Sequence, residues 1–145
     1  MISNTTHIGL LTFACDFEET VIRSAGTEPF RISLAEYYIL GHAIELGLKS
    51  YLVMKGLNEK CLRKIGHDLE KVFSSALSSG ISEEYATPEL CACIEILNPH
   101  YSTKELEYFI KAKGMRLPKQ MVLQAAVRKL LSGLDAYYRN QININ

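Results

Sequence analysis

The stretch from Ser33 to Gly56 constrains the fold of this chain more than any other. Placed on a helix at about 100° per residue, it carries apolar side chains in nearly every direction. These side chains are Leu34, Tyr38, Ile39, Leu40, Ile44, Leu46, Leu48, Tyr51, Leu52 and Val53. A helix that is apolar almost all round is buried on several sides. We therefore expect a central helix with the other elements packed around it.

Helical spacing of apolar residues continues through most of the remaining chain. It predicts helices over residues 7–26, 67–80, 87–98, 102–111 and 119–139. Residues 57–66 are expected to form a polar connection, with or without one short turn, and residues 141–145 a polar tail. The Asn98-Pro99 pair predicts a turn, and Thr87 followed by Pro88 is typical of a helix start. No segment has the pattern of a strand. The expected fold is a single all-α domain over 1–145, an up-and-down helical bundle of about five helices.

Composition places the chain among globular proteins. It has 145 residues, of which 48% are hydrophobic and 22% charged, and no apolar run reaches the roughly 18 residues that a bilayer requires. The apolar residues 8–15 have no basic segment before them and acidic residues after them, so they are expected to form a core helix face and not a signal peptide. Without a secretion signal, four reduced cysteines in the cytoplasm are the default expectation.

Charge is unevenly distributed although the net charge is zero. Residues 1–100 hold 8 Lys and Arg against 13 Asp and Glu, and residues 101–145 hold 8 against 3. This asymmetry is compatible with a nucleic-acid-facing surface, and equally with helices that attract one another within the bundle or across a dimer. Lys111, Lys113, Arg116 and Lys119 form a candidate contact for RNA phosphates, although cations around a loop are usually only solvated.

The polar side chains of the central stretch fall together. His42, Glu45 and Lys49 share roughly a 60° sector of the helix. Two interpretations are open. The three side chains form a satisfied polar seam in the bundle or in a dimer interface, or they form a ligand or proton-transfer site in which His42 titrates near neutrality.

A second polar pair opens the next predicted helix. His67 and Asp68 stand where backbone N–H groups can hold an anion such as phosphate. The alternative is that they cap this helix and hydrogen-bond to the central one. If His67 approaches Glu45 or Lys49 in the fold, the two polar groups form one site.

Metal and cofactor motifs are weak or missing in the sequence. Cys91 and Cys93 stand two residues apart, but no second pair of cysteine or histidine residues at zinc spacing accompanies them. There is no H-E-x-x-H sequence, no phosphate-binding loop and no dinucleotide-binding glycine pattern. We therefore expect neither a metal nor a cofactor.

Two short motifs resemble those of the HEPN superfamily, which comprises small helical domains associated with nucleotides and RNA. The sequence GHAIELGLKSYL resembles the family's long-helix run, and IGHDLEKVF resembles its following His-Asp-Leu signature. The matching residues are Ala43, Ile44, Glu45, Leu48, Lys49 and Leu52, then His67, Asp68 and Leu69. The resemblance implies an up-and-down helical bundle that often dimerises. It also implies partners such as a nucleotidyltransferase, an antitoxin, RNA or a nucleotide.

The RNA-cutting members of that superfamily carry an arginine followed, after four to six residues, by a histidine. Here Arg63 and His67 have only three residues between them, and no other histidine lies at the required distance after an arginine. We therefore expect a non-catalytic interaction module, most simply a homodimer. The alternatives are a toxin-type endoribonuclease that uses His67 or His100 with a basic partner, and a bundle that binds a small ligand between its helices, with Glu45 and Lys49 facing a cavity.

Overall fold

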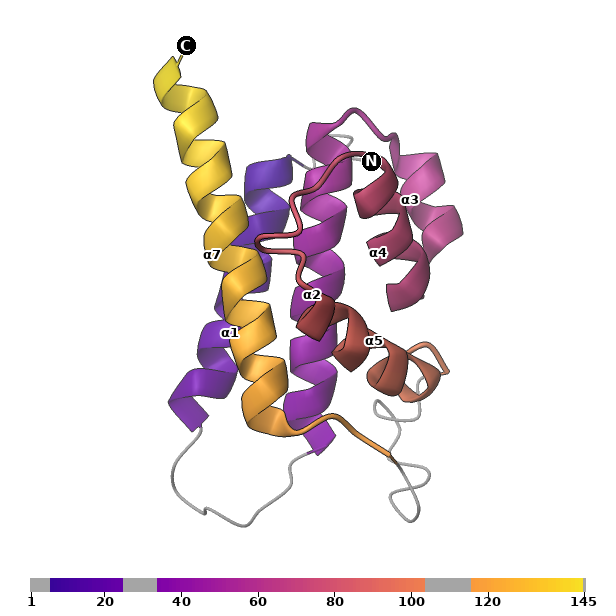
Figure 1. Ribbon diagram of the computed structural model, residues 1–145. Coiled ribbons are helices and arrows are strands. Elements are labelled where there is room, and N and C mark those ends of the chain that lie inside the picture. The colour runs from indigo at the N-terminus through magenta and orange to yellow at the C-terminus, as the bar shows by residue number, and fades with distance from the viewer. Residues whose placement is uncertain (1–5, 25–33, 104–115, 145) are drawn as a thin grey trace.

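The computed structural model describes residues 6–24, 34–103 and 116–144 (Figure 1). The described helices are α1 (His7–Ser24), α2 (Leu34–Met54), α3 (Glu59–Ile65), α4 (Leu69–Ser78), α5 (Pro88–Tyr101) and α7 (Gln120–Ile144). These ranges contain no strand. The prediction of an all-α helical bundle is therefore confirmed for the described part of the chain.

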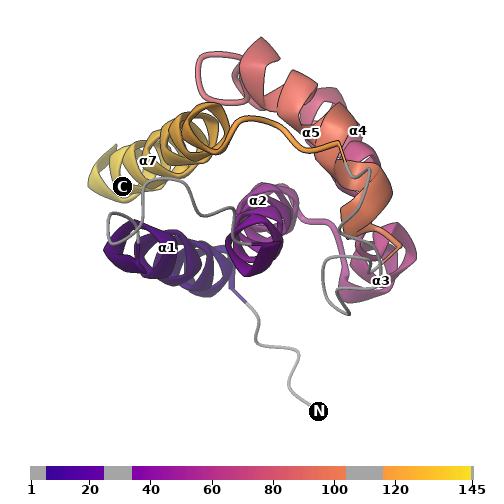
Figure 2. The same ribbon diagram turned by 90° about the horizontal axis from the view of Figure 1, so that it is seen from below.

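Helix α2 lies at the centre of the bundle. It contacts α1 and α7 on one side and α4 and α5 on the other (Figure 2). Ala43, Ile44 and Leu48 on this helix are completely buried. Burying one side chain of the size of leucine contributes about 1.5–3 kcal/mol, so a helix that is apolar on every side is stable only where neighbours cover it.

Side-chain caps fix where the short helices begin. The Thr87 hydroxyl accepts a hydrogen bond from the Leu90 backbone N–H at 3.1 Å, and Pro88 occupies the first helical position. Asn58 caps α3 in the same way through the Cys61 backbone N–H. Each cap satisfies a backbone donor that the first turn of a helix leaves without a partner.

Three sequence predictions about helix boundaries were wrong. The polar connection at 57–66 contains more than a turn, namely the helix α3 of 7 residues, none of which is buried. Helix α5 continues through Pro99 to Tyr101 instead of turning at Asn98, because a proline near the end of a helix removes only one backbone hydrogen bond. The expected polar tail after residue 140 is helical as far as Ile144.

Other predictions fall on residues outside the described ranges. These are the end of the first helix near Gly26, the helix start at Ser33, and almost all of the helix expected at 102–111. The apolar run at 8–15 belongs to α1, where Leu11 and Ala14 are buried in the core. Among the helices of the described ranges, none combines the length and the apolar character that a membrane crossing demands.

Candidate functional site

A buried carboxylate, that of Glu45, lies at the centre of the candidate site. Its side chain is 3% exposed. The Tyr101 hydroxyl donates to Oε1 at 2.7 Å, and the Lys49 ammonium donates to Oε2 at 2.8 Å. His67 Nδ1 lies 3.0 Å from Oε1 and 3.1 Å from Oε2. We call Glu45, His42, Lys49, His67 and Tyr101 the polar cluster.

The backbone brings these side chains together from three parts of the fold. Glu45 and Lys49 are four residues apart on α2 and therefore lie one above the other on the same face. The connector between α3 and α4 supplies His67, and it turns at Gly66 with a φ of 61°, a value that favours glycine. Besides its bond to Glu45, the Lys49 ammonium donates a hydrogen bond to the Gly66 carbonyl at 2.7 Å. Tyr101 enters from the last turn of α5.

Hydrogen bonding keeps Glu45 ionised. Burial alone would raise the pKa of this carboxyl group, but hydrogen bonds from Lys49, Tyr101 and His67 outweigh that effect and hold its pKa below the ordinary glutamate value. An ionised carboxylate only accepts hydrogen bonds. The nitrogen of His67 that faces it, Nδ1, therefore carries a proton.

His42 completes the polar cluster on the side of α1. Its Nδ1 lies 3.1 Å from the Tyr101 hydroxyl. Because that hydroxyl gives its single proton to Glu45, Nδ1 of His42 is the donor in this contact. Burial lowers the pKa of His42, although the nearby Glu45 opposes the shift. The His42 ring also packs edge-on against the Phe17 ring, with ring centroids 4.9 Å apart, and stacks on the Tyr38 ring, with ring centroids 6.2 Å apart.

Asp68 belongs to a neighbouring interaction and not to the polar cluster itself. Its Oδ1 accepts hydrogen bonds from the Lys71 backbone N–H and from the Asn98 amide, both at 3.1 Å. The Asn98 side-chain oxygen in turn accepts from the Leu69 backbone N–H at 2.8 Å. Two N–H groups that could have held an anion at the start of α4 are thus occupied by side chains of the chain itself, which tie α4 to α5.

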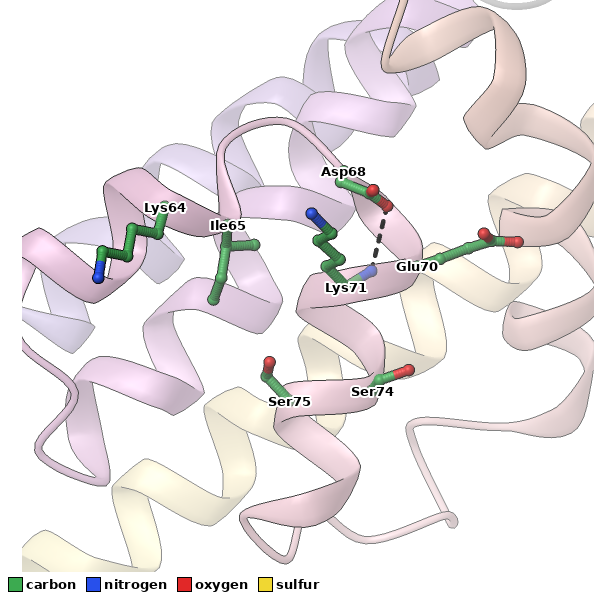
Figure 3. Close-up of a pocket in the computed structure, with 7 residues that line it drawn as sticks. All are labelled: Lys64, Ile65, Asp68, Glu70, Lys71, Ser74 and Ser75. Atoms are coloured by element: carbon green, nitrogen blue, oxygen red, sulfur yellow. Dashed lines mark hydrogen bonds between the residues drawn. The ribbon is translucent and has the colours of Figure 1, made fainter.

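A shallow hollow of about 530 Å³ lies between the end of α3 and the first turns of α4 (Figure 3). Its charged lining residues are Lys64, Asp68, Glu70 and Lys71. Figure 3 shows the Asp68 carboxylate turned back toward the α4 backbone, where it forms its capping hydrogen bond. Two cations and two anions give this lining no net formal charge, so its composition does not single out an anionic ligand.

The remaining sequence candidates lie away from the polar cluster or outside the described residues. Arg116 and Lys119 are exposed just before α7, whereas Lys111 and Lys113 lie outside the described ranges. Burial raises the pKa values of the Cys91 and Cys93 thiols, and neighbouring glutamates raise them further. Within the described residues, no three His, Cys, Asp or Glu side chains are arranged to hold a metal ion.

Sequence reasoning missed two members of these networks, Tyr101 and Asn98. Tyr101 was missed because the helix was predicted to end at Asn98-Pro99, and Asn98 was interpreted only as part of the turn that ends it. On a helix that continues to Tyr101, these residues stand three apart and share one face. The signal in the sequence was a tyrosine and an asparagine on the inner face of one helix. Buried polar side chains need hydrogen-bond partners, so these two predict contacts with neighbouring helices.

Comparison of the chain with protein-family models, curated proteins and solved structures gives no significant match.

Proposed function

We propose that this chain is a non-catalytic, HEPN-like interaction module that acts through its surface and not through chemistry in its interior. The observation that carries the proposal is that the Glu45 carboxylate at the centre of the polar cluster is buried and fully hydrogen-bonded within the chain. Both oxygens of Glu45 are engaged by donors of the same chain, and only 3% of its side chain is exposed. Such a carboxylate joins α2, the α3–α4 connector and α5, and it offers little surface to a ligand.

The ionisation states support a structural role. A general acid or base works best when its pKa lies near the working pH. The pKa of Glu45 is held below the ordinary glutamate value, and burial lowers the pKa of His42, so neither group is tuned toward neutrality. The sequence also lacks the arginine–histidine spacing of the RNA-cutting members of the family that it resembles.

The partner in this proposal is a protein, most simply a second copy of the chain. The resemblance also favours a nucleotidyltransferase or an antitoxin as a heterologous partner, and RNA or a nucleotide as a ligand of the exposed basic residues. Arg116 and Lys119 are the described members of that basic group. Contacts of this kind between cations and phosphates position a nucleic acid without reading its sequence.

A second candidate function is RNA cleavage, and one observation favours it. The His67 side chain is 55% exposed while its Nδ1 is held by the buried Glu45 carboxylate. A carboxylate that orients one nitrogen of an imidazole leaves the other available for proton transfer, which is the arrangement of many catalytic histidines. This is the weaker candidate because the neighbouring cation, Lys49, is only 13% exposed and already donates to Glu45 and to the Gly66 carbonyl, so it is not free to hold an RNA phosphate.

A cleavage assay separates the two candidates. Purified protein is incubated with single-stranded and structured RNA, beside the His67→Ala and His100→Ala variants. We expect no cleavage above the buffer background with any of the three proteins, because the polar cluster performs no proton transfer. Cleavage by the wild-type protein that disappears in the His67→Ala or the His100→Ala variant would overturn the proposal. Equal cleavage by all three that stays with the chain at constant specific activity on repurification would also overturn the proposal, whereas cleavage that repurification removes belongs to a contaminating nuclease.

A further inference from the structure

Helices α1 and α7 lie side by side at the edge of the bundle (Figure 2) and run in opposite directions. His7 near the start of α1 contacts Tyr138 near the end of α7, with ring centroids 4.8 Å apart. Glu18, further along α1, pairs with Arg128, which is nearer the start of α7. The two helices therefore form a continuous outer surface, which we call the α1–α7 face.

A groove of about 330 Å³ opens on this face, and the buried Glu18 is part of its lining. Glu18 is 8% exposed, and its Oε2 atom has no hydrogen-bond partner among the described residues. The nearest cation is Arg128, whose Nε lies 3.4 Å from Oε2 without hydrogen-bond geometry. Burial raises the pKa of Glu18, and the opposing effect of Arg128 offsets this desolvation only in part.

Exposed apolar side chains stand at both ends of the face. Ile22 on α1 is 40% exposed and Met121 on α7 is 84% exposed, and both line the groove. At the opposite end, Ile8 is 47% exposed and Ile142 is 61% exposed. By the helical step, Met121, Arg128 and Ile142 share roughly a 60° sector of α7. The face thus has apolar ends and a charged middle.

The charges of the two helices are opposite. Helix α1 carries Asp16, Glu18 and Glu19 against one arginine, and α7 carries Arg128, Lys129 and Arg139 against one aspartate. A two-fold axis parallel to the helices would lay α1 of one copy over α7 of the other at the same level. Acidic residues would then meet basic ones, Ile22 would meet Met121, and Ile8 would meet Ile142.

We propose that the α1–α7 face binds the same face of a second copy of this chain, with the Glu18 carboxylate accepting a hydrogen bond from Arg128 of that copy. This inference rests on the proposed function in naming the partner of the interaction module. A two-fold contact requires a surface that is complementary to itself, and paired acidic and basic helices flanked by apolar residues meet that requirement. It also brings a second guanidinium to the Oε2 atom of Glu18, whose ion pair with Arg128 of its own chain, at 3.4 Å, lacks hydrogen-bond geometry.

Sedimentation equilibrium of the full chain at several concentrations tests the proposal. We expect a dimer in the wild-type protein. Met121→Asp, at an 84% exposed position, should raise the dimer dissociation constant about tenfold or more, because it puts a charge in the apolar part of the interface. Arg128→Glu should also raise it, because glutamate would then face glutamate across the interface. Circular dichroism spectra establish that each variant is folded.

Phe13→Asp is the matched control. Phe13 is 60% exposed on α1. By the helical step it lies about 140° around α1 from Glu18, the residue that pairs with α7, so this change should leave the dissociation constant within about twofold of wild type. A monomer at every concentration would overturn the proposal, and so would a dimer that Met121→Asp and Arg128→Glu leave intact or that Phe13→Asp dissociates. The RNA assay does not depend on these results, so failure of this interface and failure of the non-catalytic assignment are distinguishable.

Discussion

Replacement of Glu45 by alanine is expected to lower the free energy of unfolding by about 3–5 kcal/mol, the usual cost of breaking a buried ion pair by removing one partner. The loss has a specific cause. The Lys49 side chain is only 13% exposed, so its ammonium group would remain largely buried without a counter-charge. The Tyr101 hydroxyl and His67 Nδ1 would lose their acceptor at the same time. Urea unfolding followed by circular dichroism measures the change.

Glu59→Ala provides a matched control for this prediction. Glu59 pairs with Arg63 at the same four-residue spacing, but the two side chains are 47% and 73% exposed. An exposed pair of this kind contributes only about 0.3–0.5 kcal/mol. If the two alanine variants lost similar amounts of stability, the polar cluster would not hold the three parts of the fold together.

Gly41→Ala is expected to destabilise the protein by about 2 kcal/mol, within the range for overpacking a core. A Cβ atom at position 41 would lie 2.6 Å and 2.8 Å from two ring atoms of Tyr101, which is 4% exposed. The ring would have to move, and its hydroxyl would then leave Glu45 and His42. The higher helix propensity of alanine, worth up to about 1 kcal/mol, offsets only part of this cost.

Gly9→Ala is the comparison for that variant. A Cβ atom at Gly9 would meet only the Thr6 hydroxyl, at 3.2 Å and near the exposed start of α1. Here the propensity term should dominate, and the variant is expected to be as stable as the wild-type protein or slightly more stable. Urea unfolding of both variants makes the comparison. A Gly41→Ala protein as stable as Gly9→Ala would show that Tyr101 does not sit tightly against α2.

The central helix was predictable because a helix with apolar side chains on every side is stable only when it is buried. Ile44 and Leu48 needed no tertiary information to be assigned to the core. The shared face of Glu45 and Lys49 was predictable for the same reason, since spacing along one helix fixes it. The approach of His67 was stated only as a condition, because it depends on how the connector turns at Gly66, which is a long-range property.

The errors lie where local signals compete with tertiary contacts. Asn98-Pro99 has the composition of a turn, yet Tyr101 reaches Glu45 only if α5 continues past it, and Asn98 on the same helix bonds to Asp68. Those contacts outweigh the one backbone hydrogen bond that Pro99 removes. Helix α3 is short and buries no residue completely, so it leaves little hydrophobic pattern in the sequence. Glu18 was missed because one acidic residue on an apolar helix face carries no motif.

The most direct test of the central claim, that the polar cluster is a structural element and not a catalytic one, is a carbon-13 NMR titration of the Glu45 side-chain carboxyl group, assigned with Glu45→Gln. We expect a pKa below the ordinary value of 4.5. Because the folded pKa is the lower one, this carboxylate stabilises the fold fully above that ordinary value and loses its contribution as the pH falls through the folded pKa. A measured pKa above 4.5, moving toward neutrality, would contradict the account and indicate a group prepared for proton transfer.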